Sequence, residues 1–172
     1  KPEMGTFMRE WLSLYDSKSG ERGIFNRQSA IKQAAKNGRR DTDHDFGCNP
    51  CSEIILRPYQ FCNLSEVVVR ESDTIDTLKE KVRLATILGT FQATLTNFKY
   101  LRNVWKKNTE EERLLGVSLT GIMDNKITST TGNTLEVMLE VLRDTAVQTN
   151  AAMAKQLKIP QSTAVTCVKP SG

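Results

Sequence analysis

Four stretches of the chain carry apolar residues at the three- and four-residue spacing of an amphipathic helix. They cover residues 3–16, 27–37, 75–101 and 133–157. Thr77 with Glu80 and Thr109 with Glu112 have the spacing of capping boxes, which favours helix starts at both places. The pattern therefore predicts helices over these ranges, with their apolar stripes packed on a core.

Shorter apolar and β-branched runs alternate with these helices. Residues 53–57 and 61–70 are expected to form two strands separated by Pro58, and residues 163–168 a third. Between the long helices, residues 114–124 hold two glycines among apolar residues, which indicates close backbone packing. Alternating strands and long helices predict an α/β fold.

The amino-acid composition limits the classes of protein to which the chain can belong but does not identify one. The chain has 172 residues, 38% hydrophobic and 26% charged, which is typical of a globular domain with a real core. The net charge of +4 suits a phosphorylated substrate without establishing one. No run of about 18 apolar residues and no signal-peptide pattern is found, so no membrane span is expected. DNA binding is not expected either. The four cysteines then favour a reducing, cytoplasmic setting and functional thiols.

One short stretch concentrates the chemistry. Asn49, Cys51 and Glu53 place a carboxamide, a thiol and a carboxylate at alternate positions, and Cys62 follows Cys51 by eleven residues. In an extended segment the first three side chains share one side. A sulfur that carries a radical or acts as a nucleophile would then lie beside an acid or base and a neutral hydrogen-bonding group.

Residues 49–53 resemble the Asn-x-Cys-x-Glu active-site loop of ribonucleotide reductases, and residues 61–66 resemble the strand that follows that loop. The resemblance implies that the chain is part of a ten-stranded α/β barrel with a central finger loop. It implies that Cys51 carries a transient thiyl radical, which takes the 3′ hydrogen of the substrate ribose. Glu53 would exchange a proton with the 3′ hydroxyl, and Asn49 would hydrogen-bond the ribose.

Two further segments resemble the same family. Residues 20–27 resemble a segment that runs near the substrate, with Arg22 in place of the family's proline, and this implies a substrate contact for Asn26. Asn26 is equally suited to cap the helix that follows it. The end of the chain resembles the phosphate-binding region of cobalamin-dependent reductases, where backbone N–H groups and a hydroxyl favour phosphate. The residues concerned are Lys169, Pro170, Ser171 and Gly172.

The second cysteine distinguishes the reductase classes. Cys62 has the spacing found in cobalamin-dependent reductases, whereas the diiron or dimanganese class has its cysteine further along, where this chain has Thr74. The resemblance thus implies adenosylcobalamin as cofactor, a ribonucleoside di- or triphosphate as substrate and a thioredoxin-like reductant. Cys62 would be half of the dithiol that reduces the 2′ carbon.

The other half of that dithiol is an upstream cysteine in the family, and no cysteine precedes Cys48 here. Residues 1–172 are therefore expected to form a partial catalytic barrel domain. Its partners would include the remaining segments of the same reductase, and the chain alone is expected to lack turnover.

Two alternatives stay open. His44, Cys48, Cys51 and Cys62 have ligand-like spacing, which would suit a non-enzymatic zinc-binding or interaction module. A zinc site gives no reason for Asn49 or Glu53, and no second Cys-x-x-Cys or His pair completes it. A domain of glycyl-radical type, which shares the barrel, is the other alternative.

Overall fold

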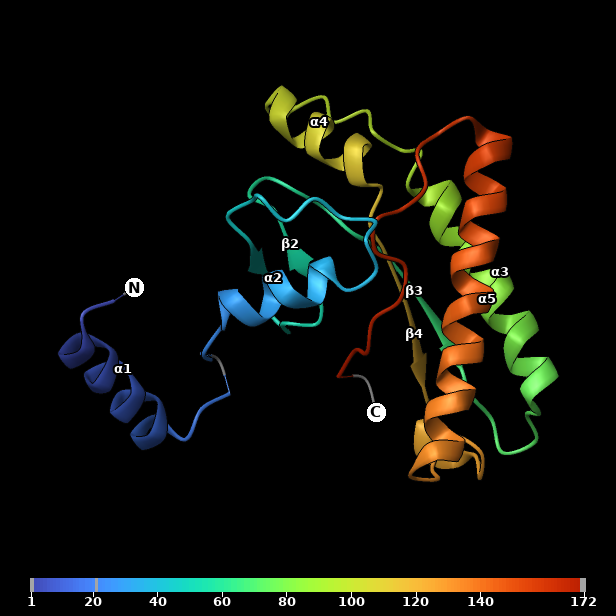
Figure 1. Ribbon diagram of the computed structural model, residues 1–172, viewed down its shortest axis with the longest axis horizontal. Coiled ribbons are helices and arrows are strands. Elements are labelled where there is room, and N and C mark those ends of the chain that lie inside the picture. Colours follow the sequence, from blue (N-terminus) through green and yellow to red (C-terminus); the bar gives the residue numbers. More distant parts are fainter. Residues whose placement is uncertain (1, 21, 171–172) are drawn as a thin grey trace.

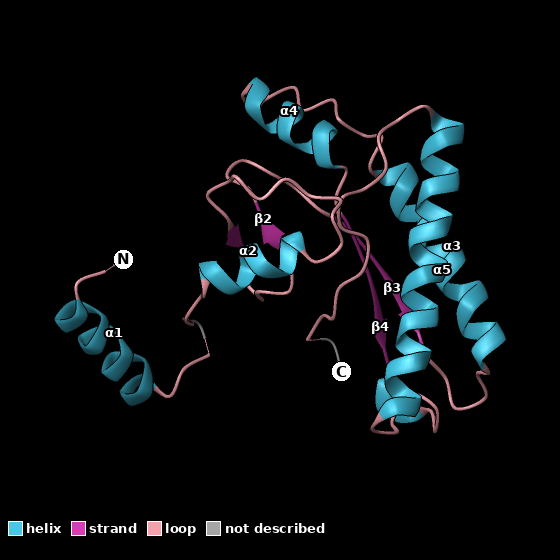
Figure 2. Ribbon diagram, viewed as in Figure 1, coloured by secondary structure: helices cyan, strands magenta, loops and turns pink. Residues whose placement is uncertain are grey.

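The computed structural model describes residues 2–20 and 22–170. Over these residues the chain is a mixed α/β structure (Figures 1 and 2). The helices are α1 Met4–Ser17, α2 Arg27–Ala35, α3 Ile75–Gln92, α4 Asn103–Glu112 and α5 Asn133–Leu157, with a short 3-10 turn at Ile122–Asp124. The strands are β1 Gly47–Cys48, β2 Ile55–Leu56, β3 Asn63–Val68 and β4 Leu115–Thr120.

The centre of the molecule is a parallel pair of strands. β3 and β4 pair in register from Asn63 opposite Leu115 to Val68 opposite Thr120. On the other edge of β4 the segment 163–169 runs parallel to it, since the Leu115 N–H donates to the Ala164 carbonyl at 3.0 Å and the Cys167 N–H donates to the Val117 carbonyl at 3.1 Å. Only the Val117–Thr166 bridge is regular there, so the strand expected over residues 163–168 is only partly formed.

Helices cover one face of this sheet. α3 follows β3 in the crossover to β4, and α5 lies in the crossover from β4 to the 163–169 segment. The two helices lie side by side against the sheet (Figure 1). Their buried faces meet the inward side chains of the strands. This core consists of Val67, Val69, Leu78, Val82, Ala85, Ala93, Leu115, Val117, Leu142, Ala146 and Val165. Alternation along β3 and β4 then turns Leu64, Gly116 and Ser118 to the opposite face.

That opposite face carries the β1–β2 hairpin. β1 and β2 pair antiparallel, with Gly47 opposite Leu56, and residues 49–54 connect them. A Cβ atom added to Gly116 would lie 3.1 Å from the Ile54 Cδ1 atom, so the hairpin packs directly on the centre of β4. The close packing predicted for the glycines of 114–124 is confirmed at this position. It is also seen at Gly121, which has a φ of +73° and no room for a Cβ beside the Val69 carbonyl.

Several boundaries differ from the expected ones. α3 ends at Gln92 and not near residue 101. The Thr94 hydroxyl donates a hydrogen bond to the Phe91 carbonyl, and the Arg113 guanidinium donates one to the Ala93 carbonyl, so these carbonyls have partners outside a continuing helix. The strand expected over residues 53–57 is reduced to β2, because the preceding residues form the turn of the hairpin.

Both expected capping boxes are wrong. Thr74 caps α3 in a reciprocal box with Thr77, whose hydroxyl accepts from the Thr74 N–H. Thr109 lies in the last turn of α4 and not at the start of a helix. α4 begins at Asn103 and ends at Glu112, where Arg113 adopts a left-handed conformation.

α1 forms as expected, but it does not pack on a core. It lies apart from the rest of the chain in Figure 1, and no residue within Met4–Ser17 is buried. The ten-stranded barrel is not seen either, since the described residues form two-stranded sheets and no closed one. Among the described residues, no helix is long and apolar enough to cross a membrane.

Candidate active site

The loop between β1 and β2 carries the predicted radical cysteine. The Ser52 N–H donates to the Asn49 carbonyl at 3.0 Å, which closes a tight turn, and Ser52 takes a positive φ of 65°. Cys51 lies at the tip of this turn and is exposed. In the part of the chain that the structure describes, its thiol forms no hydrogen bond.

Asn49 stabilises the base of the same loop. Its side-chain oxygen accepts the Ile54 N–H at 3.0 Å, and its own N–H donates to the Ile54 carbonyl at 3.3 Å. The carboxamide oxygen is therefore occupied within the loop. The expectation that residues 49, 51 and 53 alternate along an extended segment is wrong, because the chain reverses direction between Asn49 and Ser52.

Glu53 leaves the turn toward the sheet and is half-buried. Its Oε2 atom is buried without a hydrogen-bond partner among residues 2–20 and 22–170. An unpaired carboxylate oxygen in such a place has free capacity to accept a proton or a hydrogen bond from a further molecule. This property is the one that a general base requires.

Two thiols lie within electrostatic reach of Glu53. Burial raises the pKa of Cys62, and the negative charge of Glu53 raises it further. The pKa of Cys167 is raised to about 11, first by burial and then by the charges of Glu53 and Cys62, while Lys169 opposes the shift. Glu53, Cys62, Cys167 and Lys169 therefore form one cluster on the sheet face opposite the helices.

Gly116 makes room for this cluster. A Cβ atom at this position would lie 3.1 Å from the Cys167 Sγ atom and 2.5 Å from the Leu64 Cδ2 atom. Cys167 is half-buried, and its thiol lies on the hairpin side of the sheet. The two-residue alternation of 163–169 could have indicated that Cys167 and Lys169 share one face.

The predicted phosphate-binding residues are only partly described. The Lys169 N–H donates to the Ser118 hydroxyl at 3.1 Å, and Pro170 is exposed. Ser171 and Gly172 lie outside the described residues. Asn26 caps α2, since its side-chain oxygen accepts the Ser29 N–H at 3.0 Å, so its helix-capping role is confirmed and its substrate role stays a prediction.

The zinc alternative is not supported. His44 pairs with Asp41 at 3.6 Å and packs edge-on against Phe46, and the Cys48 thiol contacts the Ser52 hydroxyl at 3.5 Å. Across the described residues, no three His, Cys, Asp or Glu side chains are grouped as metal ligands.

Sequence reasoning also missed a buried polar network behind the hairpin. The Arg40 guanidinium donates two hydrogen bonds of 2.8 Å to the two carboxylate oxygens of Glu112 and one of 2.9 Å to the Ile55 carbonyl. Gln60 also donates to Glu112. A charged run such as residues 39–45 is usually a solvated loop, but Arg40 is buried and pairs with Glu112, 72 residues further along the chain.

A comparison with solved structures gives one likeness in keeping with this geometry. The chain is similar to a crystal structure of a B12-dependent (class II) ribonucleotide reductase, with a TM-score of 0.58 and 23% sequence identity over 79% of this chain. At that identity the likeness shows the fold. Over the part that is covered, the chain has an α/β arrangement similar to that of a segment of this reductase.

The likeness covers only part of the reductase, since the chain spans 21% of the length of that protein. No protein-family model and no curated protein sequence matches the chain.

Proposed function

We propose that this chain is a catalytic-barrel segment of an adenosylcobalamin-dependent ribonucleotide reductase. The observation that carries the proposal is the combination of the reductase-like fold with Cys51 at the tip of a short hairpin that packs on the sheet. A radical on sulfur can act on one carbon–hydrogen bond only if the sulfur is held in place, and the hairpin bonds of Asn49 provide that rigidity.

Cys51 begins the proposed chemistry. Its exposed thiol fits the cofactor, because a radical source outside the chain can reach it. Adenosylcobalamin, when bound, supplies the radical that removes the hydrogen atom of this thiol. The Cys51 sulfur then forms an S–H bond with the 3′ hydrogen of the ribose as the carbon–hydrogen bond breaks.

Glu53 acts at the adjacent hydroxyl. Its unpartnered Oε2 atom accepts the 3′ hydroxyl proton, which makes loss of the 3′ hydrogen easier. The 2′ hydroxyl leaves as water with a proton from one of two thiols, and the 2′ carbon gains the hydrogen of the other thiol. Glu53 returns its proton to the 3′ oxygen, and the Cys51 S–H returns its hydrogen atom to the 3′ carbon. Cys62 and a second thiol supply two electrons by forming a disulfide, which a thioredoxin-like dithiol reduces.

Phosphate recognition completes the proposal. The substrate is a ribonucleoside di- or triphosphate, and Lys169 to Gly172 bind its phosphates with Asn26 as a further substrate contact. The position of Lys169 in the cluster with Glu53 and Cys62 supports this assignment, since it brings a positive charge beside the reacting groups.

The test uses a reductase whose barrel is completed around this segment. Cys51→Ser should abolish deoxynucleotide formation, because a serine O–H bond is too strong for the radical source to break readily. Glu53→Gln should slow turnover by roughly a hundredfold or more while substrate still binds. Cys48→Ser is the matched control, since Cys48 lies in the same hairpin, its thiol lies 3.5 Å from the Ser52 hydroxyl, and it is expected to be dispensable. Turnover by Cys51→Ser would contradict the proposal.

The role of Cys62 is tested separately. Cys62→Ser should stop multiple turnover with a dithiol, yet a radical should still form on Cys51, because one thiol cannot close the disulfide. Undiminished multiple turnover by this variant would place the reducing pair elsewhere.

A further inference from the structure

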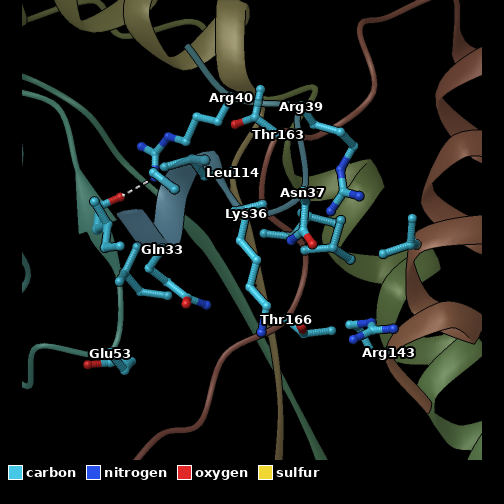
Figure 3. Close-up of a pocket in the computed structure, with 17 residues that line it drawn as sticks. Gln33, Lys36, Asn37, Arg39, Arg40, Glu53, Leu114, Arg143, Thr163 and Thr166 are labelled. Atoms are coloured by element: carbon cyan, nitrogen blue, oxygen red, sulfur yellow. Dashed lines mark hydrogen bonds between the residues drawn. The ribbon is translucent and has the colours of Figure 1, made fainter. Parts of the chain in front are cut away.

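A cavity of about 210 Å³ lies beside the candidate active site, and its lining combines apolar residues with four basic side chains and two threonines. Its walls come from α2 and the loop after it, from the hairpin, from the 163–166 segment and from α5 (Figure 3). Pockets for drug-sized ligands measure roughly 300–1,000 Å³, so this cavity suits a compact ligand.

Positive charge dominates this cavity. Lys36, Arg39 and Arg143 are arranged around it, whereas Glu53 lies apart from them at one end (Figure 3). Arg143 is partly neutralised by Asp144 at 3.0 Å and Glu140 at 3.6 Å.

The other charged groups differ in their pairing. Arg40 also lines the cavity but is paired with Glu112. Lys36 and Arg39 form no ion pair with any residue that the structure describes. The cavity therefore holds uncompensated positive charge.

Two unsatisfied donors and, at the far end, one unsatisfied acceptor belong to residues that line this cavity. Among the described residues, five buried side-chain polar atoms lack a partner, and three of them belong to residues that line the cavity: Arg39 Nε, Thr163 Oγ1 and Glu53 Oε2. A buried donor without a partner is destabilising, so such groups are usually matched by water, an ion or a ligand. Arg39 and Thr163 can both donate, and they lie near each other at one end of the cavity (Figure 3).

We propose that this cavity binds a phosphoryl group, held by Arg39, Lys36 and Thr163. A guanidinium presents a planar fork of N–H donors that matches phosphate oxygens, and an ammonium adds a point charge. Lys36 at the end of α2, Arg39 in the loop after it and Thr163 in the 163–166 segment all supply hydrogen-bond donors, which phosphate oxygens accept. This site is separate from the substrate residues Lys169 to Gly172 and does not depend on the proposed catalysis.

The phosphoryl group belongs either to free pyrophosphate or to a nucleotide. Calorimetric titration of the 172-residue chain with pyrophosphate, ATP, adenosine and malonate distinguishes these sources. We expect saturable binding of pyrophosphate or ATP with a Kd below about 1 mM, and none of adenosine. Tighter binding of ATP than of pyrophosphate would identify a nucleotide as the ligand, and the reverse would identify free pyrophosphate.

Variants test the assignment to this cavity. Arg39→Ala should weaken binding tenfold or more, and Thr163→Val, which keeps the shape of the side chain, should weaken it severalfold. Lys32→Ala is the matched control, because Lys32 is an exposed cation on α2 that does not line the cavity. Circular dichroism of each variant checks that it is folded, and Thr163→Val still tests the site if Arg39→Ala unfolds.

Three outcomes would overturn the proposal. They are no heat of binding up to about 10 mM ligand, equal affinity in Arg39→Ala and Lys32→Ala, or equal affinity for malonate and pyrophosphate. Cys51→Ser should bind the probe as the unmodified chain does, so failure of the anion site and failure of the reductase chemistry are separate results.

Discussion

At the scale of single residues, Gly116 decides how closely the hairpin and the thiols approach the sheet. A Cβ atom there would meet Leu64 at 2.5 Å and Cys167 and Ile54 at 3.1 Å each. Gly116→Ala should therefore lower the free energy of unfolding by about 1–3 kcal/mol, as overpacking of a core does. Urea unfolding measures this change.

Gly47→Ala is the control for Gly116→Ala. Gly47 is also in a strand, but an added Cβ would meet nothing within 4 Å. This variant should be neutral or slightly stabilising, because alanine reduces the entropy of the unfolded chain. Equal losses for both variants would mean that crowding at Gly116 is not the cause.

The thiols of Cys62 and Cys167 should stay protonated at neutral pH. The pKa of each is raised by burial first and by Glu53 second, and that of Cys167 reaches about 11. Iodoacetamide should thus alkylate exposed Cys51 first at pH 8, as peptide mapping by mass spectrometry will show. Glu53→Gln should speed alkylation of Cys62 and Cys167, and an unchanged rate would contradict the cluster.

The same pKa shift affects stability. The folded chain holds the Cys167 proton to a higher pH than the unfolded chain, whose thiol titrates near pH 9. Folding stability should therefore fall as pH rises from about 9 to about 11, because the unfolded state loses its proton first. Urea unfolding across this range should show a smaller fall for Cys167→Ala.

At the scale of elements, the start of α3 is set by Thr74 and not by Thr77 and Glu80. The Thr74 hydroxyl accepts the Thr77 N–H, and Glu80 pairs only with exposed Arg83. Thr74→Ala should cost about 0.5–2 kcal/mol of unfolding free energy. Glu80→Ala should cost well under 1 kcal/mol, as expected for an exposed ion pair. If Glu80→Ala lowered the unfolding free energy more than Thr74→Ala did, the capping box of Thr77 with Glu80 would be supported instead.

Helical periodicity predicted α1, α2, α3 and α5, because the apolar residues of each recur at helical spacing, but it did not predict α4. It did not predict where α3 ends, since that depends on the tertiary bond from Arg113 to the Ala93 carbonyl. The same limit applies to the hairpin. The local sequence of residues 49–53 allowed an extended segment with side chains on alternate sides, but the hydrogen bonds between Asn49 and Ile54 close a turn instead.

At the scale of the whole molecule, the resemblance of residues 49–62 predicted an α/β fold, which is confirmed, and a ten-stranded barrel, which the described residues do not form. The spatial neighbours of these residues could not be predicted. Glu53, Cys62 and Cys167 meet because two crossovers bring β3, β4 and the 163–169 segment together in parallel. Arg40 and Glu112 likewise meet across 72 residues. Contacts of such separation depend on topology, which local patterns do not specify.

The Arg40–Glu112 pair connects the hairpin half of the chain to α4 and β4. Both side chains are about 95% buried, with 4% and 5% exposed, and Arg40 also bonds to the Ile55 carbonyl of β2. Glu112→Gln should cost about 3–5 kcal/mol, because it leaves the guanidinium buried without a counter-charge. The double variant Arg40→Met with Glu112→Leu should recover much of that loss, since it removes both charges.

Urea unfolding of the single and double variants measures the two free energies, and Glu111→Gln is the matched control. Glu111 is the neighbouring carboxylate on α4, and it pairs with Arg57 and Lys107 near the surface. Amide exchange in residues 47–56 should also rise in Glu112→Gln, because the hairpin loses its anchor. If Glu112→Gln unfolds at the same urea concentration as Glu111→Gln, the buried pair does not hold the hairpin in place.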